Sequence, residues 1–159
     1  MTILFTTLQS NYLSSNPSSP RFASQVKLFE EIGWDEFLKN PNYTNTCAIR
    51  VSLAMVRSGL KDNNGSHRIL KGPSTGQRIE VSMKKLASSI EQSSQFSKAE
   101  RYTTNIYPKV KGRSGIIAFF TIPGYSGGGH IDLLNGNFPD MRCESACYSS
   151  QEVWFWPMK

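Results

Sequence analysis

A cysteine and a histidine, far apart in the chain, have the types and settings of a nucleophile and its base. Cys47 follows the polar pair Asn45-Thr46 and stands in the first turn of a predicted amphipathic helix. Because the N-terminal end of a helix carries partial positive charge, it stabilises the thiolate, which is the reactive form. The alternative is a small buried apolar residue, the commonest role of a lone cysteine.

His130 opens a predicted strand directly after three glycines, Gly127-Gly128-Gly129. Residues without side chains let a ligand or another backbone approach the imidazole closely. A cysteine at a helix start and a histidine on a later strand are the arrangement of papain-like thiol hydrolases, in which the two side chains meet where helix and sheet pack. The alternative is a hydrogen-bonded histidine at a strand edge. The other histidine, His67, is expected to be exposed in a polar loop.

A third group should orient the imidazole, and three acids qualify. Asp132 lies two residues after His130, on the same face of the strand. A three-residue loop at 135–137 would bring Asp140 opposite Asp132, diagonal to His130 and within about 7–8 Å, whereas a two-residue loop would turn it to the other face. We predict Asp140 as the third residue, with Asp132 and then Glu144 as alternatives. Asp132 could instead be a solvent-facing carboxylate.

The other two cysteines, Cys143 and Cys147, lie four residues apart in a segment expected near His130. They could form a small disulfide ring in an oxidising compartment or remain thiols in a reducing one. We expect no zinc site, because two cysteines at this spacing fall short of four ligands. The chemistry of a thiol hydrolase needs no metal or cofactor.

The surrounding sequence predicts helices first and an antiparallel sheet afterwards. Residues 9–24 are rich in Ser, Asn and Pro, so 1–24 is predicted to be an irregular lead-in. Apolar periodicity predicts helices over residues 24–38, 46–58 and 82–92. Residues 61–78 are predicted to form a loop. Runs of β-branched and aromatic residues predict strands over residues 115–122, 130–134 and 152–156. Asn135-Gly136 is predicted to form a turn after the second of these strands. This order indicates an α+β fold in one domain, residues 1–159.

Size and composition limit the class of protein. The chain has 159 residues and a mass of 17.8 kDa, which suits a single domain. Its longest strongly apolar run, Ile116 to Phe120, is far shorter than the roughly 20 residues of a membrane span, so we expect no membrane insertion. Met1 to Phe5 is too short for a secretory signal and has no preceding basic region.

The positive charge is concentrated in the middle of the chain. The formal net charge is +6, yet residues 66–113 alone hold ten basic residues against three acidic ones. This balance favours an anionic partner, such as nucleic acid, acidic lipid or an anionic cell-wall polymer. The alternative is an ordinary solvated face.

Three short stretches, in order along the chain, resemble the fourth family of type VI secretion amidase effectors. The first is similar to the cysteine helix of that family and is followed by Ala54 and Gly59: Asn45-Thr46-Cys47-Ala48-Ile49-Arg50-Val51-Ser52. The second is similar to the histidine strand: Gly129-His130-Ile131-Asp132-Leu133-Leu134-Asn135-Gly136. The third is similar to the last strand: Val153-Trp154-Phe155-Trp156-Pro157.

The resemblance implies a papain-like peptidoglycan amidase, made without a signal peptide, exported by secretion machinery and acting in the periplasm of rival Gram-negative bacteria. It implies cleavage of stem peptides between γ-D-glutamate and meso-diaminopimelate, and a cognate immunity protein that blocks the site. The family's thiol maps to Cys47, its histidine to His130 and its aspartate to Asp140. Family members can carry a disulfide after the histidine strand, which suits Cys143 and Cys147.

Two departures from the family concern the third residue and the substrate lid. The family often has Trp where this chain has Leu134, and the segment 137–143 is longer than usual. Two other functions remain open from the residues alone. One is a papain-like protease or deamidase acting on a protein. The other is a basic nucleic-acid-binding module with an inert Cys47, which predicts steeply salt-dependent binding to DNA or RNA.

Overall fold

The computed structural model describes residues 3–60, 65–125, 129–136, 138–139 and 144–159. Its helices are α1 Phe5–Ser10, α2 Gln25–Ile32, α3 Cys47–Arg57, α4 Met83–Gln92, α5 Ile106–Val110 and α6 Glu144–Tyr148, with 3-10 turns η1 Asp35–Phe37 and η2 Pro41–Tyr43. Its strands are β1 His67–Arg68, β2 Arg78–Ile79, β3 Glu100–Tyr102, β4 Arg113–Phe120, β5 Gly129–Gly136, β6 Phe138–Pro139 and β7 Glu152–Pro157. The predicted α+β fold is confirmed.

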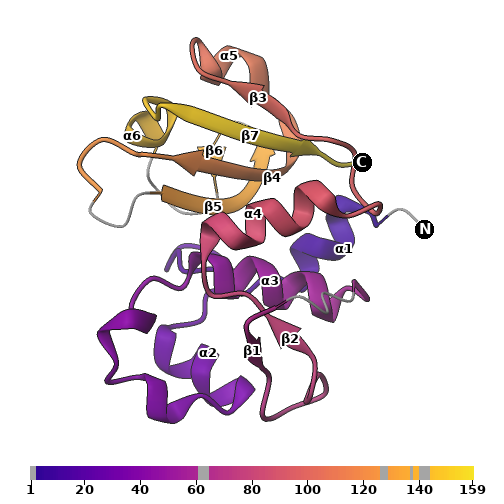
Figure 1. Cartoon of the computed structure of the whole chain (residues 1–159), viewed down its shortest axis with the longest axis vertical. Helices are drawn as coiled ribbons and strands as arrows, with labels where there is room; N and C mark the ends of the chain where they lie inside the picture. The colour runs from indigo at the N-terminus through magenta and orange to yellow at the C-terminus, as the bar shows by residue number, and fades with distance from the viewer. Residues whose placement is uncertain (1–2, 61–64, 126–128, 137, 140–143) are drawn as a thin grey trace.

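The main sheet is antiparallel throughout, with the strand order β3-β7-β4-β5-β6. Helices α1, α3 and α4 lie on one side of it, and α5 and α6 lie on the other (Figure 1). Strand β6 pairs with β5 only at Leu134 and Asn135. Among the described strands, none pairs with the outer edge of β5 at residues 130–133, and this leaves the edge accessible to side chains from other elements.

Helix α3 is the central element of the fold, since all but one of its eleven residues are buried. Its small residues Ala48, Val51 and Ala54 pack toward the sheet, in the same apolar cluster as Ile131 and Leu133 of β5. Its larger residues pack on the opposite side, against α2 and the β1–β2 hairpin: Ile49, Leu53 and Val56. The position of α3 between two apolar clusters fixes the place of Cys47, its first residue.

The prediction of an irregular lead-in is wrong for residues 5–10, which form α1. Phe5, Leu8 and Tyr12 follow a helical spacing, and their side chains are buried in the same cluster as Cys47. The backbone N–H of Phe5 also donates to the carbonyl oxygen of Lys159 at 2.6 Å. This hydrogen bond connects α1 to the residues after β7. These apolar residues, rather than the Ser- and Asn-rich background, decide the local structure.

The structure corrects several other boundaries. The first predicted helix ends at Gly33, whose left-handed φ of 79° forms its C-cap. The predicted 61–78 loop contains the β1 strand and the start of β2. Strand β5 continues through the predicted Asn135-Gly136 turn, and Phe138 of β6 pairs with Asn135. The helix at 82–92 and the strands near 115–122, 130–134 and 152–156 are confirmed within a few residues.

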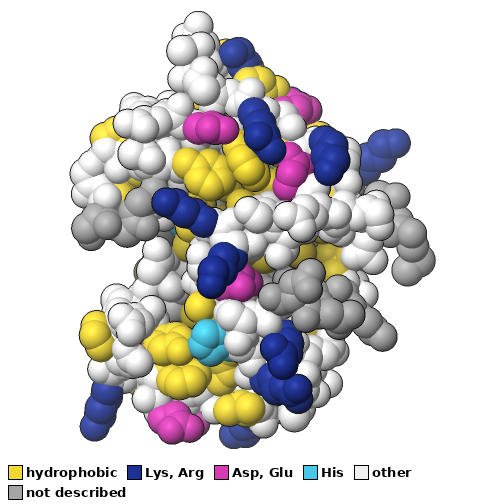
Figure 2. All heavy atoms as spheres, viewed as in Figure 1, with side chains coloured by type: hydrophobic (Ala, Val, Ile, Leu, Met, Phe, Trp, Pro, Cys, Tyr) yellow, Lys and Arg dark blue, Asp and Glu magenta, His cyan; other side chains and the backbone are white. Residues whose placement is uncertain are grey.

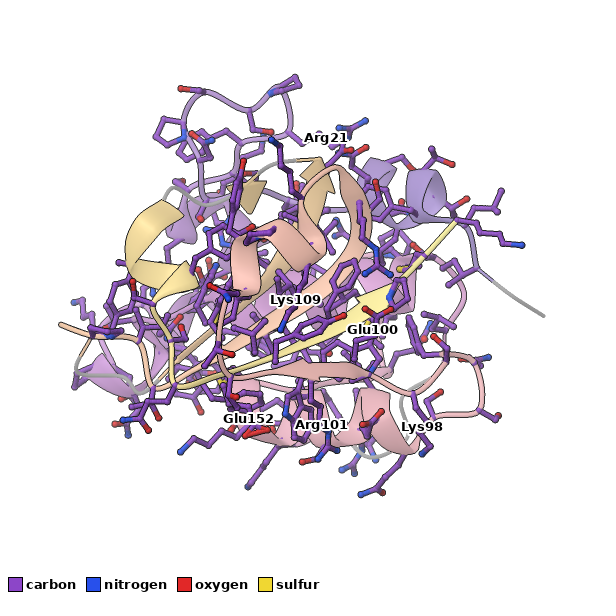
Figure 3. The ribbon with its side chains drawn as sticks, turned by 90° about the horizontal axis from the view of Figure 1, so that it is seen from above. Arg21, Lys98, Glu100, Arg101, Lys109 and Glu152 are labelled. Carbon is purple, nitrogen blue, oxygen red and sulfur yellow. The ribbon has the colours of Figure 1, made fainter. Side chains whose placement is uncertain are left out.

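The basic middle of the sequence spreads over several elements. Figure 2 shows Lys and Arg side chains from one end of the visible face to the other, with carboxylates between them. Arg101 pairs with Glu91, and Arg113 pairs with Glu100. Seen from above in Figure 3, Lys98 and Arg101 lie along the same side as Glu152. In the described part of the chain, no helix has the length and apolarity to cross a membrane.

The packing of α1 gives a stability prediction. Leu8 is fully buried, whereas Leu4 is 53% exposed. Leu8→Ala is therefore expected to lower the free energy of unfolding by about 2–5 kcal/mol, and Leu4→Ala by less than about 0.5 kcal/mol. Urea unfolding of both variants measures the difference. Equal effects of the two substitutions would contradict the packing of α1 on the core.

Candidate active site

Cys47 lies at the first position of α3 and is 7% exposed. Its backbone N–H has no partner within the helix, because it belongs to the first turn. It donates instead to the side-chain oxygen Oδ1 of Asn45 at 3.2 Å. The Asn45 side chain thus covers the N–H group beside the thiol. Any substrate oxygen that uses this donor must displace the Asn45 amide oxygen.

His130 and Asp132 form a buried pair on β5. Nε2 of His130 lies 2.8 Å from Oδ2 of Asp132. The two residues are 3% and 0% exposed. Their spacing of two places both side chains on one face of the strand, as the sequence predicted. The alternative of a solvent-facing Asp132 is wrong.

The second carboxylate oxygen of Asp132 is held by two donors. Oδ1 accepts a hydrogen bond from the hydroxyl of Tyr12 at 2.9 Å and from the backbone N–H of Leu133 at 2.8 Å. A buried carboxylate needs such partners, because burying an unpaired charge is strongly unfavourable. Sequence reasoning missed Tyr12, which is 120 residues from Asp132. The signal in the sequence was the helical spacing of the apolar residues 5, 8 and 12, which predicts that Tyr12 faces the core.

The charges around His130 favour the imidazolium form. Burial opposes that form most strongly, but the charge of Asp132, its hydrogen bond and the hydrogen-bonded Cys47 thiol outweigh burial and raise the pKa of His130 from 6.5 to about 10. Because Nε2 faces Asp132, Nδ1 is the nitrogen left for the thiol. The raised pKa means that the charged pair stabilises the fold fully below pH 6.5, and that this contribution disappears as the pH rises through about 10.

Aromatic rings lie beside the His130 imidazole. The ring of Phe119, on the paired strand β4, lies parallel to that of His130 with centroids 6.4 Å apart. Tyr148 of α6 contacts Phe119 edge-on, and burial together with the charges of Tyr107 and Asp132 raises the pKa of Tyr148. The buried neighbour of Tyr148, Cys147, is in a disulfide. Cys47 is a free cysteine.

Three of the predicted residues lie wholly or partly outside the part of the chain that the structure describes. Asp140 and Cys143 lie outside the described residues, and of Glu144 only its place at the start of α6 is described. His67 is partly buried rather than exposed, and its ring bonds to the hydroxyl groups of Tyr43 and Ser66. Among the residues described, no cluster of three or more His, Cys, Asp or Glu side chains could hold a metal ion.

Comparison with known families identifies the class of protein. A family model of type VI secretion system amidase effectors matches residues 43–156, a span that holds Cys47, His130 and Asp132. The protein is thus an amidase effector. The chain belongs to the family of amidase effector protein 4, Tae4. A search of curated proteins found no match.

Solved structures share the fold across the whole chain. A Tae4-Tai4 effector–immunity complex from Enterobacter cloacae matches with 18% identity and a TM-score of 0.77, covering 100% of both chains. Tae4 alone from the same species matches with 17% identity and a TM-score of 0.76, over 100% of this chain and 98% of that one. Tae4 from Salmonella typhimurium, in complex with Tai4, matches with 16% identity and a TM-score of 0.75 over 99% of both chains.

The charge around His130 gives a titration prediction. We expect its imidazole to titrate near pH 10, and Asp132→Asn to lower that pKa because the substitution removes the neighbouring negative charge. NMR titration of ring-labelled histidine measures both values. His67, the other histidine of the sequence, supplies the reference signal. An unchanged His130 titration in Asp132→Asn would contradict the contact.

Proposed function

We propose that this amidase effector cleaves peptidoglycan stem peptides between γ-D-glutamate and meso-diaminopimelate, with Cys47 as nucleophile and His130 as acid and base. The observation that carries the proposal is the buried His130–Asp132 pair on β5. The Cys47 thiol at the start of α3 is among the groups that raise the pKa of His130. Membership of the Tae4 family supports hydrolysis of an amide rather than nucleic-acid binding. The particular bond comes from the sequence resemblance.

The reaction proceeds through a thioester. The proton of the thiol rests on the His130 imidazole, as the raised pKa of His130 favours. The Cys47 thiolate attacks the carbonyl carbon of the substrate amide. The resulting oxyanion collapses, the C–N bond breaks, and His130 gives its proton to the leaving amine. A water molecule then attacks the thioester while His130 accepts its proton. The acid is released, and the proton returns to the thiolate–imidazole pair.

The backbone N–H of Cys47 is the proposed donor to the oxyanion. Since this N–H donates to Asn45 Oδ1 in the free protein, the substrate oxygen takes the position of that amide oxygen. Binding therefore includes a rotation of the Asn45 side chain. Asn45 is exposed, so the rotation meets little packing resistance.

Asp132 is the acid that we assign to orient His130. It keeps the imidazole tautomer and stabilises the imidazolium, as the carboxylate does in other triads. Asp140, which the family resemblance favours, remains a prediction. The two assignments are separated by mutation.

The partners follow from the relatives. The Tae4 proteins of Enterobacter cloacae and Salmonella typhimurium form complexes with Tai4 immunity proteins. We propose a cognate immunity protein for this chain, delivery through a type VI secretion system, and action in the periplasm of recipient bacteria. Binding of the exposed basic side chains to the anionic wall polymer remains a prediction.

Digestion of purified diaminopimelate-type peptidoglycan tests the reaction. The wild-type protein is expected to release stem-peptide fragments with a new γ-D-glutamate terminus, and mass spectrometry identifies the bond. Cys47→Ala is expected to reduce the rate by at least about a thousandfold, because it removes the nucleophile. Full activity of Cys47→Ala would disprove the mechanism. Wild-type cleavage at another bond would overturn only the substrate assignment.

Two amide substitutions test the third residue. Asp132→Asn is expected to lower kcat by about 10²–10⁴-fold with the fold intact. Asp140→Asn is the matched variant and is expected to lower kcat less. The rates are measured on one soluble muropeptide, with thermal melting as the check on folding. The reverse order of effects would assign the orienting role to Asp140.

A further inference from the structure

A tyrosine from the N-terminal segment completes the hydrogen-bond chain of the candidate site. The hydroxyl of Tyr12 donates to Oδ1 of Asp132, while Oδ2 of the same carboxylate contacts His130. Tyr12 is 4% exposed and packs in the apolar cluster that contains Cys47. It lies outside residues 43–156, the span that matches the family model. The contact joins the N-terminal segment to the span that holds Cys47 and His130.

The segment around Tyr12 is anchored to the helix that carries the nucleophile. Arg50 of α3 is 3% exposed, and its guanidinium donates to the carbonyls of Leu13 at 3.2 Å and of Ala23 at 2.7 Å. Nε of Arg50 also donates to the hydroxyl of Thr46, the residue before Cys47. One turn of α3 thus fixes both the thiol and the backbone next to Tyr12.

We propose that Tyr12 is a positioning residue for the hydrolysis reaction, and that it acts by holding the Asp132 carboxylate in the orientation that contacts His130. The inference rests on the proposed function of Cys47 and His130. Tyr12 does not reach the substrate in this role. It makes the N-terminal segment a part of the catalytic machinery rather than only a part of the core.

The physical reason is the asymmetry of the Asp132 carboxylate. Two donors, the Tyr12 hydroxyl and the Leu133 N–H, hold Oδ1, so that Oδ2 faces the imidazole. A hydrogen bond from a neutral donor to a carboxylate is stronger than one between neutral groups. Without the Tyr12 hydroxyl, one of these donors to Oδ1 is lost, and the carboxylate is less restrained against turning away from His130.

The substitution Tyr12→Phe tests this role, because it removes only the hydroxyl and keeps the buried ring. We expect kcat on a soluble muropeptide to fall on the order of tenfold, with KM nearly unchanged. Tyr102→Phe is the matched control. Tyr102 also donates its hydroxyl to a carboxylate, that of Glu100, on the edge strand β3. The control is expected to keep the wild-type kcat, and melting temperatures of both variants measure any loss of stability.

A second measurement separates positioning from a general structural effect. Iodoacetamide alkylates Cys47 without forming an oxyanion, and the pH dependence of its rate reports the ionisation of the groups around the thiol. In the described part of the chain they include the His130 imidazole, the Asp132 carboxylate and the phenol of Tyr12. The phenol of Tyr148 is coupled to the charge of Asp132. In Tyr12→Phe, the step caused by His130 deprotonation should move to lower pH, in the direction of the Asp132→Asn profile. Tyr102→Phe should leave that step in place.

Each outcome has a defined meaning. Reduced kcat in Tyr12→Phe together with the shifted alkylation step supports the inference. Wild-type kcat together with an unshifted alkylation step in Tyr12→Phe would overturn the inference. A loss of kcat that follows the loss in melting temperature and is equal in Tyr102→Phe would also overturn it. If the wild-type protein fails to cleave peptidoglycan, the proposed function fails, and the alkylation profile alone still decides whether Tyr12 positions Asp132.

Discussion

The arrangement of the candidate site depends on the buried negative charge of Asp132. Asp132 is fully buried, and a carboxylate in that setting is tolerated only where its oxygens are hydrogen-bonded and a positive group lies beside it. His130 supplies the positive group, and Tyr12 and the Leu133 N–H supply further donors. These partners come from the first segment of the chain and from β5. The N-terminal segment and the sheet must therefore both be in place before the charge is satisfied.

Helix α3 brings these parts together because it packs on both of its sides. Its small residues allow close approach to the sheet, and its larger ones form the second core with α2 and the β1–β2 hairpin. Arg50 adds a polar connection from the same helix to the segment after Tyr12. A buried helix of this kind holds the thiol in a defined place, as the proposed role of Cys47 requires.

The relatives show how little of the sequence such a fold requires. Tae4 structures with 16–18% identity match this chain over its length. Apolar positions can exchange among residues of similar volume while the pattern and the packing are retained. Buried polar contacts are less exchangeable, because removing one partner leaves the other unpaired. The contacts of Asp132 and Arg50 are of this kind.

The sequence by itself determined the helix–sheet order, the place of Cys47 at the start of a helix and the shared strand face of His130 and Asp132. These features depend on local periodicity, turn residues and a two-residue repeat, all of which are visible in one chain segment. Only the tertiary structure decided that Asp132 is buried against His130, that Tyr12 reaches the same carboxylate and that residues 5–10 are helical and belong to the core. The Tyr12 contact joins residues that are 120 positions apart. Such contacts arise from the packing of whole elements, which no local pattern encodes.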